Sequence, residues 1–153
     1  MKKNNKIKNQ LFALCLASLD TRLQAIQKQI VEIQESLTSE TKSSAGDKHE
    51  TGRAMLQLER EKAGVQLSEI QKQQDTLAKV NILKTSETIC LGSVVYTSKS
   101  NYFIAISAGE IKINDEFFYA ISPITPIGKL LLGKRRDDVF VFNKQTINIK
   151  AVI

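Results

Sequence analysis

Two carboxylates, Asp47 and Glu50, lie three positions apart in the stretch from Gly46 to Thr51. Carboxylate oxygens are ligands that Mg²⁺ prefers, and residues three apart share one face of a helix. Two carboxylates alone hold Mg²⁺ weakly because the ion favours six oxygens, so a metal site here needs further ligands from a partner. A structural alternative stays open: Asp at a helix start with Glu three residues later is a variant of the capping box, and both charges favour a helix N-terminus.

Other side chains with possible chemistry form no complete site. His49, between the two carboxylates, can move a proton, but a single exposed His is more often inert. Cys15 lies beside an apolar run and Cys90 in a predicted strand, so we expect both to be packing residues. One His and two Cys are too few for the usual four-ligand zinc site. With no Gly-rich phosphate loop and no Ser-His-Asp set, the chain is not expected to be an enzyme by itself.

Positive charge is in modest excess. The 22 Lys and Arg against 16 Asp and Glu give a formal net charge of +6, which favours anionic partners. The run Lys134, Arg135 and Arg136 and the Lys cluster before Asn9 can contact phosphates or acidic protein, or can serve solubility alone.

The N-terminal segment imitates an export signal, because the Lys cluster precedes the apolar run 11–16. Leu14 stands before Cys15, where a lipoprotein cleavage site needs a small residue, and the apolar residues continue downstream at helical spacing. No stretch approaches the ~18 consecutive apolar residues that span a bilayer. We therefore expect a cytoplasmic protein without membrane contact.

One long helix is predicted over residues 6–39. Its apolar residues alternate steps of four and three, as in a coiled-coil seam, and no Pro or Gly interrupts them. The polar stretch Thr38 to Gly46 predicts a loop. The seam residues are Phe12, Leu16, Leu19, Leu23, Ile26, Ile30, Ile33 and Leu37.

A second helix is predicted over residues 52–84, folded back on the first. Pairing positions whose numbers sum to 93 places Leu37 opposite Leu56 and Leu23 opposite Ile70. Arg60, Gln74 and Asn81 weaken this register, and an intermolecular coiled coil remains an alternative. With ~34 residues in each arm, the tip near residues 46–50 would stand ~50 Å from the base. An internally paired hairpin predicts a monomer.

After residue 84 the composition changes to β-branched and aromatic residues. Strands are predicted at about 90–97, 101–107, 116–122, 137–143 and 146–152, with a short helix over 126–132. Pro126 suits the first turn of that helix, and Gly133 suits its end. The fold class is thus α+β, with a long antiparallel coiled-coil hairpin over 1–84 followed by a small domain over 85–153.

Two motifs make the chain resemble the bacterial Gre family of transcript cleavage factors. The family's tip motif, Gly-Asp followed by two variable residues and Glu, is matched by Gly46, Asp47 and Glu50. A more specific C-terminal signature covers the second domain. Its matching residues are Ser122, Pro123, Gly128, Lys129, Leu131, Leu132, Gly133, Lys134, Asp138 and Val139.

The resemblance implies a fold, a partner and a mechanism. The C-terminal domain would resemble FK506-binding proteins and dock on RNA polymerase through Ser122, Pro123, Gly128, Lys129, Gly133 and Lys134. The hairpin would enter the secondary channel, where Asp47 and Glu50 help the polymerase hold a shared Mg²⁺. The polymerase would then cut backtracked nascent RNA, with this chain as an accessory factor that has no cofactor of its own.

Departures from the family pattern keep alternatives open. The family usually has Asn after the tip Glu and further acidic and aromatic residues, where this chain has Thr51, Gly52, Arg53 and Ala54. A channel-binding regulator or inhibitor without cleavage activity is therefore the main alternative. A prolyl isomerase is disfavoured because the chain has no Trp to floor the substrate pocket. A coiled-coil adaptor without polymerase contact is the third.

Overall fold

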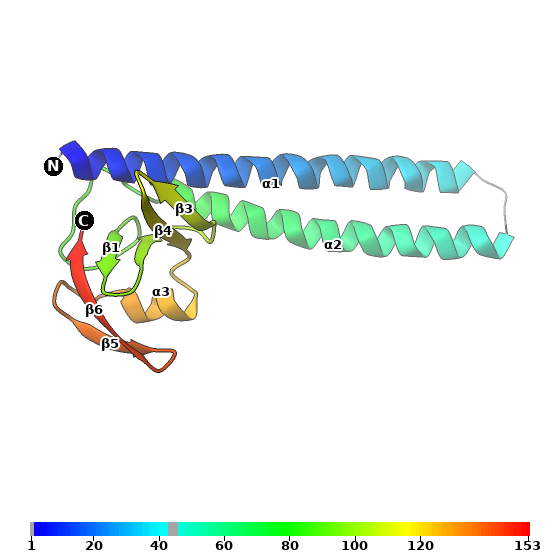
Figure 1. Ribbon diagram of the computed structural model, residues 1–153. Helices are drawn as coiled ribbons and strands as arrows, with labels where there is room; N and C mark the ends of the chain where they lie inside the picture. The colour runs from blue at the N-terminus through cyan, green and yellow to red at the C-terminus, as the bar shows by residue number, and fades with distance from the viewer. Residues whose placement is uncertain (1, 43–45) are drawn as a thin grey trace. The chain divides into compact units, whose positions relative to one another are not determined.

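The computed structural model describes residues 2–42 and 46–153, with side chains for residues 3–39 and 50–153. Two long helices are followed by a six-stranded sheet and one short helix, which confirms the predicted α+β class (Figure 1). The likeness of the sheet domain to FK506-binding proteins stays a prediction.

The two long helices are α1, Lys2–Lys42, and α2, Gly46–Ala78. α1 contains no Pro or Gly, and it extends beyond the predicted 6–39 at both ends. α2 begins earlier than the predicted residue 52, so the predicted loop is shorter than expected, and it ends well before residue 84. Gly64 lies inside α2. Apart from the backbone of the helix itself, a Cβ added at Gly64 would meet only the flexible end of the Arg60 side chain, at 3.2 Å.

Residues 19–74 form one compact unit, which consists of the two antiparallel helices alone. The Arg22 Nη2 group donates a hydrogen bond to Gln73 Oε1 at 2.9 Å, which confirms that α2 folds back on α1. The buried seam contains Leu19, Ile26 and Ile33 from α1, and Ala63 and Ile70 from α2. The predicted hairpin face is therefore correct along this unit.

Residues 1–18 and 75–153 form the other compact unit. Here the predicted seam was wrong: Leu16 is 47% exposed, and Ile7, Leu11 and Cys15 are buried instead. In this stretch, Ile7 and Gln10 line a hollow together with Ile113 and Phe118 of the sheet. A sheet surface does not impose the alternation of three and four steps that a partner helix imposes.

The sheet has the strand order β3-β4-β2-β1-β6-β5. Neighbouring strands are antiparallel except β2 and β4, which are parallel. The strands are β1 Val94–Thr97, β2 Asn101–Ile104, β3 Gly109–Ile113, β4 Glu116–Ile121, β5 Val139–Phe142 and β6 Gln145–Val152.

The short helix α3, Pro126–Leu131, packs its buried Leu131 into the core of the sheet domain. That core also contains Ile89, Val95, Ile104, Phe140, Ile147 and Ile149. β3 was missed from the sequence, although Glu110, Ile111, Lys112 and Ile113 alternate polar and apolar residues as a strand does. Asn114 and Asp115, both with positive φ, form the turn that joins β3 to β4, and this Asn-Asp pair was a usable hairpin signal.

The predicted domain boundary between residues 84 and 85 stays a prediction.

In the part of the chain that the structure describes, none of the helices combines the length and the apolar character needed to cross a membrane.

Candidate functional site

The tip carboxylates belong to the first turns of α2. Because α2 begins at Gly46, Asp47 and Glu50 lie three positions apart on a helical backbone and start from one helix face. The Glu50 side chain is exposed, whereas the side chains of Asp47 and His49 lie outside the described residues. The metal-binding role of the pair therefore stays a prediction. Within the described residues, no three His, Cys, Asp or Glu side chains gather as a metal site would require.

An apolar stripe on α2 follows the tip and was missed from the sequence. Met55 is 61% exposed, Leu58 51% and Val65 63%. Their positions lie off the seam that contains Leu56 and Ala63, so the seam assignment already implied that they face outward. The stripe gives α2 exposed apolar side chains in addition to the carboxylates at its start.

The first half of the C-terminal motif builds the start of α3. The Thr125 hydroxyl donates to the Ser122 carbonyl at 2.7 Å and accepts from the Gly128 backbone N–H at 3.2 Å, so Thr125 is the N-cap. A Cβ added at Gly128 would lie 2.3 Å from the Ser122 carbonyl oxygen and 3.1 Å from the Pro123 carbonyl carbon. Only Gly fits there, so this part of the motif is required by packing.

The second half of the motif ends α3 and joins it to the core. Gly133 has a φ of +84°, which favours Gly, and its N–H donates to the Ile89 carbonyl at 2.9 Å. Lys134 accepts from the Ile89 N–H at 2.8 Å, and its Nζ lies 5.9 Å from the centroid of the Phe140 ring. These contacts give Gly133 and Lys134 structural roles, while their predicted partner contacts stay untested.

Exposed residues around α3 are the ones left for a partner. Ile124 is 77% exposed, although it lies inside the motif, and Lys129 is exposed on α3. Leu130 and Leu132 are 37% and 38% exposed. Sequence reasoning named Lys129 but missed Ile124, because an apolar residue in a motif is expected to be core.

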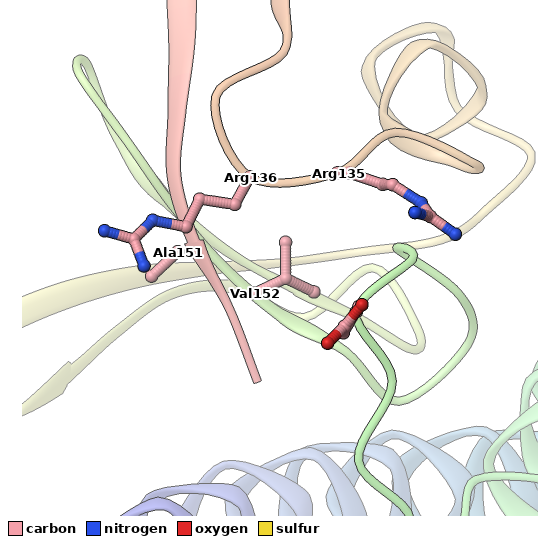
Figure 2. Close-up of a pocket in the computed structure, with 5 residues that line it drawn as sticks. Arg135, Arg136, Ala151 and Val152 are labelled. Carbon is pink, nitrogen blue, oxygen red and sulfur yellow. The ribbon is translucent and has the colours of Figure 1, made fainter.

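The basic run after the motif borders a hollow of about 460 Å³ that Glu87, Ala151 and Val152 also line. Arg135 Nε donates to Thr88 Oγ1 at 3.2 Å. Figure 2 shows the Arg135 and Arg136 guanidinium groups pointing to opposite sides of the hollow. They do not converge as a phosphate clamp would, so the hollow does not by itself identify an anion site.

Lys8 is the most deeply buried charged residue described, with 1% of its side chain exposed. Its Nζ donates to the Lys84 carbonyl at 3.1 Å. Burial lowers the pKa of the Lys8 amine below its ordinary value, and the neighbouring Cys90 thiol opposes this shift. This hydrogen bond joins the start of α1 to the segment after α2, which gives Lys8 a structural role.

Comparison with known proteins gives a likeness to solved structures only. No protein family matches the chain, and no curated protein matches it. One similar solved structure is described as that of the transcription factor Gfh1, with 22% sequence identity and a TM-score of 0.34. The alignment covers 88% of this chain and 90% of that chain. The function therefore has to be argued from the residues of this chain.

Proposed function

We propose that the chain is a transcription factor that binds RNA polymerase, inserts its hairpin into the secondary channel and stimulates cleavage of backtracked nascent RNA. The observation that carries this proposal is the position of the tip motif. Gly46 opens α2, so the carboxylates of Asp47 and Glu50 start from the turn of a two-helix hairpin, where a narrow channel would receive them first.

Glu50 and Asp47 would act as ligands and not as an independent active site. An exposed Glu50 is free to meet a metal held mainly by another protein, and two carboxylates fit a site that shares its ligands with a partner. Mg²⁺ held in this way would polarise a phosphate oxygen and lower the pKa of a bound water. The role of this chain is to bring oxygens to that site and to orient them.

The α3 surface would dock on the polymerase. Ile124 and Lys129 are exposed beside a motif whose backbone turns require Gly at positions 128 and 133. An apolar anchor beside a cation is a typical centre of a protein interface. Gly128 would contribute to docking indirectly, because it is buried and its N–H and C=O groups are hydrogen-bonded within the domain, whereas Ser122, Pro123 and Gly133 would contact the partner directly.

A regulator that occupies the channel without stimulating cleavage is the second candidate. It is favoured by Thr51, Gly52 and Arg53, which replace the polar and acidic residues that usually follow the tip. Arg53 lies three positions after Glu50 on the same helix, and a cation at that position would oppose recruitment of Mg²⁺.

The test is cleavage of 3′-labelled RNA in a stalled, backtracked elongation complex with Mg²⁺. We expect wild type to release short RNA and the Asp47→Ala, Glu50→Ala variant to lose at least about a hundredfold in rate, because both added oxygens are gone. The matched control, Glu59→Ala with Glu61→Ala, removes two exposed carboxylates farther along α2 and should cleave like wild type.

Three other outcomes would contradict this proposal. Equal cleavage by wild type and the tip variant would exclude the tip carboxylates as ligands. No release by wild type, combined with protection from a known cleavage factor, would identify the channel-binding regulator. Failure of the wild type to bind polymerase would leave a coiled-coil adaptor.

A further inference from the structure

β5 is the open edge of the sheet. It ends the strand order and pairs only with β6 among the described strands (Figure 1). The opposite edge differs, because Gln10 and Ala13 of α1 line a hollow together with Lys112 and Ile113 of β3. Edges that lack such cover present unpaired backbone groups to any extended chain that approaches.

The backbone of β5 has a defined outward side. Ile149 N–H donates to the Asp138 carbonyl at 2.9 Å, so Asp138 directs its carbonyl toward β6. Backbone groups alternate in direction along a strand. The N–H and C=O groups of Phe140 therefore also point toward β6. The N–H and C=O groups of Val139 and Val141 point away from the sheet and are available for a further ladder of hydrogen bonds.

The side chains of β5 fit a docking strand. Val139 is 56% exposed and Val141 63%, while Phe140 is buried and Phe142 packs against the core. The inward residues anchor the strand, and the β-branched outward residues offer apolar surface beside the open backbone groups. This combination is the one used in recognition by strand addition.

The charges near β5 select an acidic occupant. Arg136 precedes the strand, Lys144 lies in the turn after it and Lys150 is exposed on β6, while Lys134 lies over the Phe140 ring. Of the two carboxylates before the strand, Asp138 already accepts a hydrogen bond from the Arg135 N–H at 2.8 Å. Residues 134–150 thus carry five cations against two carboxylates, so the chain around β5 has a net positive charge.

We propose that the β5 edge binds an extended acidic segment of a partner protein, which adds a seventh strand to the six-stranded sheet. Val139 and Val141 supply the backbone hydrogen bonds, and Lys144 and Lys150 select the acidic residues. This contact is separate from the proposed action of the tip, and neither requires the other.

A second copy of the chain fits the edge less well. β5 has four residues, so pairing of two β5 strands would bury far less than the ~1,200 Å² that specific interfaces usually need. It would also bring together two surfaces with the same net positive charge, which repel each other.

The test uses two fluorescein-labelled nine-residue peptides and fluorescence polarisation with the full chain. One peptide alternates Glu and Val, and the other alternates Lys and Val. Val141→Pro removes an outward N–H while leaving the bonds between β5 and β6 in place, since Pro is tolerated at strand edges. Val141→Thr is the matched control that keeps the N–H and the β-branch.

We expect wild type to prefer the Glu peptide over the Lys peptide. Val141→Pro should bind the Glu peptide at least about tenfold more weakly, and Val141→Thr should stay within about twofold of wild type. Lys144→Glu with Lys150→Glu leaves the backbone unchanged, so it tests the charge rule even if the Pro variant does not fold. This double variant should reverse the peptide preference.

Several outcomes would overturn the proposal. They are equal binding of the Glu peptide by wild type and a folded Val141→Pro variant, preference of wild type for the Lys peptide, and no binding of the Glu peptide at millimolar concentration. A concentration-dependent dimer in sedimentation that Val141→Pro abolishes would assign the edge to a second copy instead.

Discussion

The two motifs that carry the family resemblance differ in how far the structure accounts for them. In the C-terminal motif, Gly128 is enforced by the Ser122 carbonyl, and Gly133 by its φ of +84°. In the tip motif, Glu50 is exposed and no described contact requires it to be acidic. One motif is explained by folding, whereas the other leaves its charges available for a partner.

This difference separates two kinds of inference. A motif whose residues are needed for a turn is good support for a fold, because the same turn is needed whatever the protein binds. A motif whose residues are exposed supports a function, because folding alone would accept many replacements. The C-terminal motif therefore supports the architecture, and the tip motif must carry the proposed activity.

The largest expected effect on stability is that of Gly128→Ala. The added Cβ would lie 2.3 Å from the Ser122 carbonyl oxygen, so the turn before α3 must shift, and we expect a loss of about 2–3 kcal/mol in the free energy of unfolding. Urea denaturation measures this loss. Gly64→Ala is the control, because its Cβ meets only the flexible end of Arg60 and Ala favours a helix by ~1 kcal/mol. A Gly128→Ala chain as stable as wild type would mean that this motif is not enforced by packing.

Ile124→Asp tests the most exposed apolar residue within the C-terminal motif. Ile124 is 77% exposed, so its replacement should leave stability nearly unchanged but weaken the proposed polymerase binding by about tenfold or more. Binding is measured by titration of labelled chain with core polymerase. Leu83→Asp is the matched control, because Leu83 is 74% exposed. Equal losses for both variants would indicate a general charge effect in place of a docking surface.

The fold was largely predictable because its local patterns agree with its architecture. The steps of three and four gave the hairpin face of residues 19–74, where the partner is another helix. The same alternation placed Leu16 wrongly, because a helix seam cannot predict which face packs when the neighbour is a sheet. β3 was missed for a different reason: residues 110–113 alternate charged and apolar side chains, but the pattern is only four residues long and follows Gly109, which is typical of a turn.

The candidate site was predictable in its residue types but not in its surroundings. Asp47 and Glu50 were found from their spacing, and their position at the start of α2 follows from a helix that begins at Gly46. Ile124, Val139 and Val141 were not identified as exposed, because exposure depends on which side of a strand or turn the rest of the chain covers. Spacing along the sequence carries no information on that cover.

A smaller effect is expected at Lys8, where burial lowers the pKa below the ordinary value of 10.5. Between the lowered value and 10.5 the unfolded chain binds more protons than the folded chain, so the contribution of Lys8 to the free energy of unfolding rises with pH. Lys8→Met removes this group at similar volume. We expect the stability of wild type relative to Lys8→Met to increase from pH 7 to pH 10 in urea denaturation. A difference that is constant with pH would show that the amine titrates alike in both states.

The smallest stability effect belongs to Glu50→Gln, and it brings the two motifs into direct contrast. The amide keeps the shape of the exposed side chain but removes its charge, so the helix N-terminus should lose less than ~0.5 kcal/mol. A neutral amide is a poor ligand for Mg²⁺, so cleavage in the backtracked complex should still fall by about tenfold or more. If the acidic pair only caps α2, cleavage is unchanged, and the stability loss also stays small because Gln keeps the hydrogen-bond acceptor of a capping box. A large functional loss with a negligible stability loss at Glu50, opposite to the pattern at Gly128, is what distinguishes a residue kept for a partner from one kept for the fold.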